Sequence, residues 1–490
     1  MSVERPVAPA FPAAPPAPGG TAAGAAPELR RTLTVVGLTA FGIGSIIGTG
    51  IFVLTGTAAA NQAGPALVLS FAIAGCGCAL TALCYAELAA MIPVSGSAYS
   101  YAHAAFGEII AWFIGWNLVL EYTFSVATVS VGWSGYVASL LAQFNLHLPP
   151  ALAQAPFDRG AGAYEIITTG AWLNVPAVLI VAAIAVLCYV GIRESSGTNT
   201  IIVALKIAVI ALFILAGVSY IQPVNWHPFI PPNTGHFGQF GWSGVLAGAG
   251  VIVFSYIGFD TISTCAQEAK RPECDMPLSI LASLGICSVL YMATVVVLTG
   301  MVSYRDLNVA APVALALDRY SGLRWLGVPV KLGAILGMTS TMLVMTIGQA
   351  RIFMRMGEDG LLPSWFSRIH PRFKTPANGT WVTGLAAAII GGLLPVRILG
   401  ELVSIGTLLA FITVCIGVLY LRRTRPDLPR PFRVPWPRFT CICGACACTA
   451  MILALPRDTW IRLILWTAIG FLIYGVYGRR HGRRALRGGP

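Results

Sequence analysis

Long apolar stretches separated by short polar segments recur along the whole chain. A run of about 20 apolar residues is long enough to cross the ~30 Å hydrocarbon core of a bilayer as a helix. The pattern predicts twelve membrane-spanning helices. They cover residues 33–57, 64–92, 106–137, 172–192, 199–221, 241–266, 279–301, 329–354, 377–395, 399–421, 438–455 and 458–478.

Composition agrees with a chain that lipid surrounds. Of its 490 residues, 56% are hydrophobic and only 10% are charged, against roughly 25% charged residues in soluble domains. The predicted fold class is therefore an all-α integral membrane protein. Residues 1–29 form an Ala/Pro/Gly-rich tail without the compact apolar core of a cleaved signal peptide, and we expect this tail to be disordered.

The placement of basic residues predicts the orientation. An even number of spans puts both termini on one side, and most of the 31 Lys and Arg residues lie in loops on that side. Basic loops stay cytoplasmic, so both termini are predicted to be cytoplasmic. The net charge of +12 is spread over many short loops, which argues against a nucleic-acid partner and leaves the bilayer as the expected surroundings.

Two of the predicted spans are interrupted by glycines near their middle. The first reads Gly-Ile-Gly-Ser-Ile-Ile-Gly-Thr-Gly-Ile-Phe over residues 42–52, and the second reads Phe-Ser-Tyr-Ile-Gly-Phe-Asp over residues 254–260. Unwound backbone at membrane depth is tolerated only where it lines a protein-enclosed or water-filled cavity. Two such breaks, five spans apart, predict an inverted repeat of five spans and a binding site at the midplane of a secondary transporter.

This repeat sets the predicted organisation of the chain. The segments are a cytoplasmic tail (1–29), a first five-span repeat (30–221), an external loop (222–240), a second five-span repeat (241–421), a basic cytoplasmic linker (422–437), and spans 11 and 12 with a cytoplasmic tail (438–490). We interpret the arginine-rich linker as a solvated loop, with contact to anionic headgroups as an alternative.

The chemistry of the two breaks predicts the class of ligand. The half-helix that starts after Gly48-Thr49-Gly50 has amide groups without intrahelical partners, which form an anion site with the helix dipole. The hydroxyl of Thr49 adds a donor. In the second break, carbonyls near Phe254, Ser255 and Ile257 suit an ammonium group. A zwitterionic α-amino acid fits both sets, whereas glycines that only allow tight helix packing are the alternative.

The same residues resemble a known family. The motif at 42–52 is similar to span 1 of the amino acid–polyamine–organocation superfamily. Residues 254–260, followed by Gln-Glu-Ala-Lys-Arg-Pro at 267–272 and by Pro277, are similar to its span 6 and the loop after it. Within this superfamily, the chain most resembles the cationic amino acid transporter family and its bacterial members. The resemblance covers roughly residues 30–480.

The resemblance implies a five-plus-five inverted-repeat fold with two trailing spans, and it implies substrate contacts. These fall at Ile46, Thr49 and Gly50 in span 1 and at Phe254, Ile257 and Gly258 in span 6. Ile51 and Ser255, which belong to the same motifs, and Met345 in span 8 complete the candidate substrate-binding set. Gln267 and Arg271 depart from the Glu and Asn that often stand in the family's loop, which affects the expected inner gate rather than the pocket.

Lys206 is the only basic residue that we place more than five residues inside a span. A buried ammonium group is costly and usually functional, although its long side chain can also reach the inner interface. The family implies that this span-5 lysine stands where related transporters bind sodium, between spans 1 and 8, with Ser340 or Thr341 as its partner. Since burial disfavours the charged amine, we predict proton-coupled or proton-sensitive transport.

Two acidic residues also fall inside spans. Glu121 in span 3 is a candidate for ordering the pocket through water or for meeting a cationic substrate side chain, and Asp260 in span 6 is a candidate inner gate. A hydrogen bond between helices is the alternative for either residue. Glu87, near the inner end of span 2, gives a weaker signal.

Met345 in span 8 is similar in position to a small residue of the mammalian cationic transporters. A methionine there shortens the side-chain pocket and favours small or neutral substrates, whereas packing is the ordinary role of a methionine on an apolar helix. The sequence leaves small neutral, branched and cationic amino acids open.

The sequence gives little support to other classes of protein. The six histidines lie in loops, in a tail or near span ends, and no metalloprotease, hydrolase or phosphate-loop motif is present, so we predict no enzyme, cofactor or metal. The cysteines at 441, 443, 446 and 448 are interpreted as small packing residues. An obligate amino acid exchanger and a non-transporting amino acid sensor remain alternatives. The excess of Arg over Lys suggests a bacterial inner membrane.

Overall fold

The computed structural model describes residues 33–92, 97–159, 166–191 and 196–478. The predicted tail at 1–29 and the last twelve residues, 479–490, lie outside the described residues. Within the described part, helices account for nearly all regular structure.

The α-helices of the first half begin at Val35. In chain order they are α1 (Val35–Ile46), α2 (Thr55–Ala58), α3 (Leu67–Met91), α4 (Ser97–Phe106), α5 (Glu108–Gln143), α6 (Pro150–Ala153), α7 (Val175–Val190) and α8 (Ser196–Gly217). The second half and the trailing helices are α9 (Gly241–Ile252), α10 (Pro272–Met301), α11 (Pro312–Asp318), α12 (Arg324–Glu358), α13 (Ala377–Leu393), α14 (Val396–Thr424), α15 (Pro437–Leu453) and α16 (Arg457–Ile473).

Tighter and wider helical turns join these elements. The π-helical turns are η1 (Gly50–Leu54), η2 (Ala59–Ala63) and η11 (Tyr474–Gly478). The 3₁₀ turns are η3 (Gly64–Ala66), η4 (Val218–Tyr220), η5 (Pro223–Trp226), η6 (Val253–Tyr256), η7 (Asp260–Glu268), η8 (Tyr304–Leu307), η9 (Ser321–Leu323) and η10 (Ser364–Phe366).

Eight helical stretches of the described residues are long and apolar enough to cross a membrane. The first of them, Val35–Met91, is 57 residues long and includes two of the predicted spans. Three shorter apolar helices, α7, α13 and α15, coincide with three further predicted spans. The protein is therefore a multi-pass membrane protein, whereas the count of twelve spans stays a prediction.

A small two-stranded sheet is an element that the all-α prediction did not contain. Strand β1 (Phe157–Arg159) pairs antiparallel with β2 (Ile166–Thr168), with Phe157 opposite Thr168. It lies in the segment between α5 and α7, which the sequence places outside the membrane. Outside the hydrocarbon core, water can satisfy the open edges of such a hairpin, so a sheet is permitted there.

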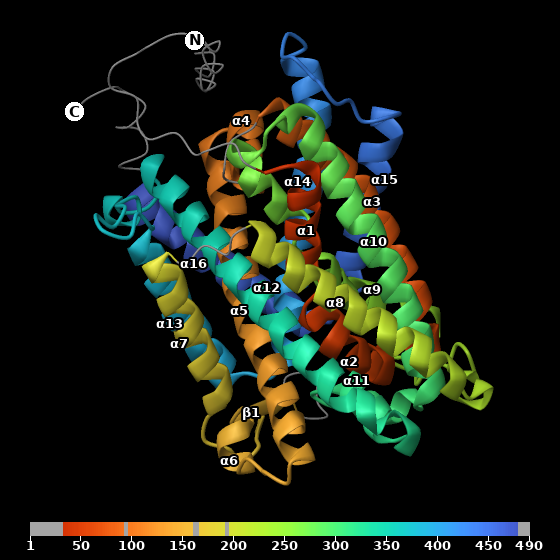
Figure 1. The fold of residues 1–490 in the computed structure, drawn as a ribbon. Helices are drawn as coiled ribbons and strands as arrows, with labels where there is room; N and C mark the ends of the chain where they lie inside the picture. The colour runs from red at the N-terminus through yellow and green to blue at the C-terminus, as the bar shows by residue number, and fades with distance from the viewer. Residues whose placement is uncertain (1–32, 93–96, 160–165, 192–195, 479–490) are drawn as a thin grey trace.

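The helices form a central group with a peripheral layer (Figure 1). Within the most apolar window of Gly241–Ala266, 94% of the residues are buried, whereas the figure for Arg457–Gly478 is 17%. The red α1 lies inside the bundle, while α7, α13, α15 and α16 lie at its sides (Figure 1). The peripheral helices expose apolar side chains such as Leu179, Leu385 and Ile464, as expected for helices that face lipid.

The four cysteines of α15 differ in how deeply they are buried. Cys441 and Cys448 are buried, Cys443 is half-buried and Cys446 is exposed. The Sγ atom of Cys441 lies 3.6 Å from that of Cys84 on α3. Their distribution around the helix supports packing between α15 and α3 rather than a shared metal site.

Candidate functional site: a pocket between two interrupted helices

The first interrupted helix ends at Ile46. Ile47 leaves the helical region, with φ −75° and ψ 97°, and helical turns resume at Gly50. Since the last carbonyls of a helix have no intrahelical partner, the carbonyl groups of this end of α1 need other donors.

Three side chains from other helices supply those donors. Lys206 Nζ on α8 donates to the carbonyl oxygens of Gly44 at 2.6 Å and Ile47 at 3.1 Å. Thr341 Oγ1 on α12 lies within 3.1 Å of the same two oxygens. The hydroxyl of Tyr291 on α10 donates to the carbonyl of Ile46 at 2.8 Å. The end of α1 is thus held by three neighbouring helices.

The second interruption follows α9. After the turn of η6, Ile257 has an extended ψ of 136°, and Gly258 has a φ of +121°. This φ is strained for residues with a side chain. A Cβ atom at Gly258 would also lie 2.6 Å from Ser45 Oγ. Glycine at 258 therefore permits both the turn and the close approach to α1.

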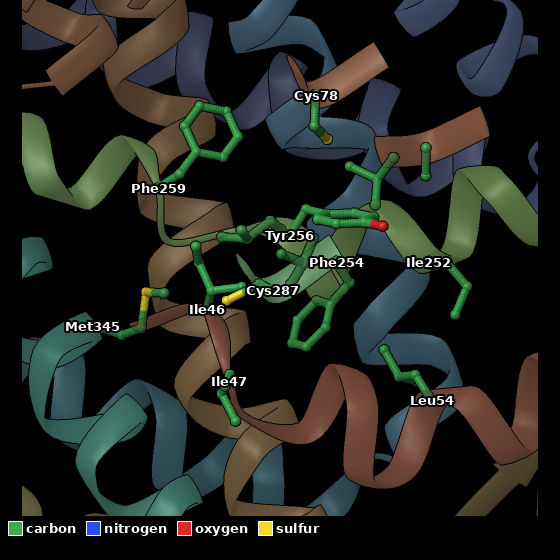
Figure 2. Packing of buried hydrophobic residues seen from close by; sticks show 14 of the residues in the cluster. Ile46, Ile47, Leu54, Cys78, Ile252, Phe254, Tyr256, Phe259, Cys287 and Met345 are labelled. Carbon is green, nitrogen blue, oxygen red and sulfur yellow. The ribbon is translucent and has the colours of Figure 1, made fainter. Parts of the chain in front are cut away.

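The two interruptions lie against each other. A Cβ atom at Gly50 would collide with the Cα and side chain of Ser255. Figure 2 shows Ile46 at the end of α1 and Ile47 on the non-helical stretch that follows it, with Met345 on one side and Phe254 on the other. The contact brings the carbonyl end of η6 and the amide start of η1 to one place.

A small cavity occupies this junction. It has room for about one water molecule. Its walls come from the two interruptions, α5 and α12: Ser45, Ile46, Gly48, Thr49, Gly50, Ser125, Val129, Phe254, Ile257, Thr341 and Met345. None of these lining residues carries a charge, so the helix ends and the hydroxyl groups supply the polarity of the pocket.

Three hydroxyl groups in the cavity wall are unusual. Ser45, Thr49 and Ser125 are each at least 98% buried, and none of their hydroxyl oxygens has a hydrogen-bond partner among the described residues. A buried polar group without a partner is destabilising. Such groups around one cavity are available to a ligand.

Six residues of the predicted substrate set line the cavity: Ile46, Thr49, Gly50, Phe254, Ile257 and Met345. Ile51, Ser255 and Gly258 do not line it; the last two pack against the opposite interruption. The sequence analysis missed Ser125 and Val129. The spacing of four and eight residues from Glu121 puts them on the same helix face, which is the signal that could have found them.

The surroundings of Lys206 distinguish between its two predicted partners. Thr341 Oγ1 lies 3.5 Å from Nζ, whereas Ser340 Oγ has no hydrogen-bond partner among the described residues. Lys206 is fully buried. Its contacts hold the interruption of α1, so this lysine does not reach the inner interface.

A second lysine is also buried, and the sequence analysis did not single it out. Lys331 on α12 is 1% exposed, and its Nζ donates to Asp318 at 2.9 Å and to Gln143 at 3.2 Å. The residue falls near the start of a predicted span, so its place at the span end hid its burial. Its ion pair joins α11 to α12 at the opposite end of α12 from the basic segment that follows Glu358.

The two acidic candidates have different surroundings. Asp260 accepts hydrogen bonds from the hydroxyl of Tyr122 at 2.8 Å, from Ser97 at 3.3 Å and from the amide of Gly258 at 3.2 Å. Glu121 is 1% exposed, and its Oε1 atom has no hydrogen-bond partner among the described residues. Asp260 thus joins α4, α5 and the second interruption, while Glu121 retains a free acceptor.

Glu87 has more hydrogen-bond and ion-pair partners than its place near the end of a predicted span indicated. It is 1% exposed and accepts from Arg422 Nε at 2.9 Å and from the amide of Val434 at 2.7 Å. Arg430 Nε lies 3.6 Å away. Part of the linker at 422–437 is therefore folded onto the end of α3, because a buried carboxylate needs partners, and the interpretation as a solvated loop is wrong for these residues.

A second cavity of about 200 Å³ lies beside α1, α12 and the start of α13. Its wall is mainly apolar, with Phe41, Leu343 and Ile347 among the lining residues. Arg351, which also lines it, forms an ion pair with Glu268 at 2.9 Å. This pair connects α12 to the end of η7.

Comparison with known proteins identifies the class to which this fold and site belong. A family model described as "Amino acid permease" matches residues 33–474. The chain therefore belongs to the amino acid permease family, and the predicted membership of the wider superfamily is confirmed.

Individual relatives are similar over nearly the full length. The chain is 45% identical to the methylthioribose transporter of Bacillus subtilis and 43% identical to the branched-chain amino acid permease BcaP of the same organism, in both cases over 93% of this chain and 95% of the relative. It is 40% identical to the vacuolar cationic amino acid transporter 4 of Arabidopsis thaliana, over 82% of this chain and 64% of that protein. All three relatives are named as transporters or permeases, and the family model together with the two amino acid carriers among them supports amino acid transport.

Proposed function

We propose that this protein is a secondary active transporter that carries a neutral L-amino acid across a bacterial plasma membrane, coupled to protons. The observation that carries the proposal is the uncharged cavity at the junction of the two interrupted helices. It lies between the carbonyl end of η6 and the amide start of η1, and these ends complement an ammonium and a carboxylate group.

The lining favours a neutral side chain. Ile46, Val129, Phe254, Ile257 and Met345 form the apolar part of the wall, and no acidic residue lines the cavity. A cationic side chain would have no partner there and would lose its hydration, which is costly. Since the cavity has room for only about one water molecule, binding requires the two interruptions to separate.

The wider architecture follows from the same proposal. We infer twelve spans in a five-plus-five inverted repeat with two trailing helices, spans 1 and 6 unwound at the midplane, and both termini cytoplasmic. The interruptions at 47–49 and 257–259, five predicted spans apart, support the repeat. The basic loops support the orientation.

Lys206 is the proposed coupling residue. It links the end of α1 to Thr341, so loss of its proton would remove charge-assisted bonds that hold the interruption in place. Asp260 is proposed to help close the inner side, because its bonds join three elements there.

A second candidate substrate has a specific observation in its favour. Ser45, Thr49 and Ser125 offer three hydroxyls without partners, and a sugar could satisfy them as well as an amino acid could. The relative that is 45% identical is named a methylthioribose transporter. Methylthioribose therefore belongs in the first substrate screen.

The test is uptake into proteoliposomes with an imposed inward proton gradient and no sodium. The radiolabelled substrates are L-alanine, L-leucine, L-arginine and methylthioribose, each with and without an uncoupler. We expect leucine or alanine to accumulate and the accumulation to collapse with the uncoupler. Uptake only into amino acid-loaded vesicles would identify an exchanger, binding without flux would identify a sensor, and neither binding nor flux of an amino acid would refute the proposal.

A further inference from the structure

Two fully buried polar side chains near the cavity have atoms without partners. Gln349 on α12 is 0% exposed, and neither its Nε2 nor its Oε1 has a hydrogen-bond partner among the described residues. Glu121 on α5 is 1% exposed, and its Oε1 also lacks a partner there. A carboxamide offers two donors and one acceptor, so Gln349 is a large unsatisfied group in the interior.

Three contacts fix the relative level of the two residues. The indole of Trp133 donates to Thr339 at 3.0 Å. A Cβ atom at Gly348 would meet the ring of Tyr122 at 2.7 Å, and one at Gly115 would meet Met356 at 2.9 Å. These pairs show that α5 and α12 run antiparallel with one constant register. In that register Gln349 stands at the level of Tyr122, the residue that follows Glu121 in the chain.

Both residues also continue the faces that line the cavity. On α12, Thr341 and Met345 line it, and Gln349 is four residues further along the same face. On α5, Val129 and Ser125 line it, and Glu121 is four residues back along that face. Gln349 on α12 and Glu121 on α5 therefore lie one helical turn beyond the cavity lining. They lie on its proposed cytoplasmic side, toward the basic loops.

Their chemistry complements a zwitterion. The carboxylate of Glu121 accepts hydrogen bonds from an ammonium group, and the amide of Gln349 donates to a carboxylate. Asp260 lies at the same level but is already engaged by Tyr122, Ser97 and Gly258. An interior that is packed and dry would not keep a whole carboxamide without partners.

We propose that Gln349 and Glu121 form a second, inner substrate site, which holds the charged groups of the amino acid after it leaves the cavity and before it reaches the cytoplasm. Water molecules occupy this inner site between transport cycles. The inference rests on the proposed function and adds a second substrate-binding site to it. Gln349 is a residue of the exit path and not of the outer pocket.

The inner site predicts that binding and flux separate in the variant Gln349→Leu. Equilibrium binding of radiolabelled L-leucine to the purified full-length protein should stay within about threefold, because the pocket is intact. Uptake of L-leucine into proteoliposomes should fall by at least about tenfold, because the exit path loses its hydrogen-bonding group. The matched control is Gln62→Leu, since Gln62 is also buried with an unpartnered Oε1 but lies in η2, away from both sites. This control should keep both binding and uptake.

Other outcomes overturn the proposal. Unchanged uptake in Gln349→Leu would mean that the carboxamide is only an unsatisfied packing residue. Loss of binding together with uptake would place Gln349 in the pocket. If wild-type protein neither binds nor transports an amino acid, the proposed function itself fails, and this result differs from a variant that loses flux alone.

A second variant tests the water-filled site if Gln349→Leu does not fold. Gln349→Cys should react with a small hydrophilic thiol reagent, and L-leucine should slow the reaction by at least about threefold if it occupies the site. Peptide mass spectrometry separates this cysteine from the native ones. An unreactive cysteine at 349 would overturn the inner site. The native Cys287, which is fully buried, is the internal control for a dry position.

Discussion

The Nζ atom of Lys206 lies 2.6 Å from the carbonyl oxygen of Gly44, so a cation from α8 caps the interrupted end of α1. A second bond from the same atom reaches the carbonyl of Ile47 at 3.1 Å. Helix ends with unpaired carbonyls are stabilised by a nearby cation. The position of the first interruption therefore depends on a residue 162 positions away in the sequence.

Replacing Lys206 with methionine should abolish most transport. Methionine keeps the apolar stem but removes hydrogen bonds to a charged donor, each of which contributes about 1.5–3 kcal/mol. We expect uptake of L-leucine to fall at least about tenfold and its dependence on the proton gradient to disappear. The control is Lys270→Met, an exposed residue. Proton-dependent uptake that persists in Lys206→Met would exclude this lysine as the coupling residue.

Replacing Gly50 with alanine should disrupt the junction of the two interruptions. A Cβ atom there would overlap the backbone of Ser255, and backbone cannot move aside as a side chain can. We expect loss of leucine binding and a lower Tm, with a cost of about 1–3 kcal/mol as for other overpacked sites. Gly285→Ala on α10 is the control, because nothing lies within 4 Å of its added Cβ. The idea fails if Gly50→Ala binds leucine as the wild type does.

Replacing Met345 with serine should widen the range of substrates. Met345 lines the cavity and is 2% exposed, and serine, whose side chain has two heavy atoms fewer, would free space beside the apolar wall. We expect uptake of L-arginine to rise at least about threefold relative to L-leucine. The measurement is competition between the two labelled amino acids in proteoliposomes. If arginine uptake is as poor as before, the methionine does not set the size of the side-chain pocket.

Replacing Glu87 with glutamine should destabilise the protein without altering substrate specificity. The change leaves Arg422 and Arg430 next to a neutral amide, and breaking a buried ion pair costs on the order of 3–5 kcal/mol. We expect Tm in detergent to fall by several degrees. Asp427→Asn is the control, because this carboxylate is 64% exposed where it pairs with Arg425 and exposed pairs contribute little. Equal Tm values for the two variants would contradict a structural role for Glu87.

The sequence by itself determined the class of protein and the place of its candidate site. Apolar stretches of membrane length cannot be solvated by water, so their pattern predicts a multi-pass helical protein. The glycine-rich motif at 42–52 and the motif at 254–260 marked the two interruptions, because only glycine permits the close approach between Gly50 and Ser255 and the φ of Gly258. These signals are local, so they can be recognised in a single sequence.

Tertiary structure alone decided which distant residues meet. Thr341 rather than Ser340 reaches Lys206, because only one face of α12 contacts the end of α1. The burial of Lys331 and the pairing of Glu87 with the 422–437 linker also depend on how helices far apart in sequence pack. Hydrophobic periodicity records that a side chain is buried, but it does not record its partner.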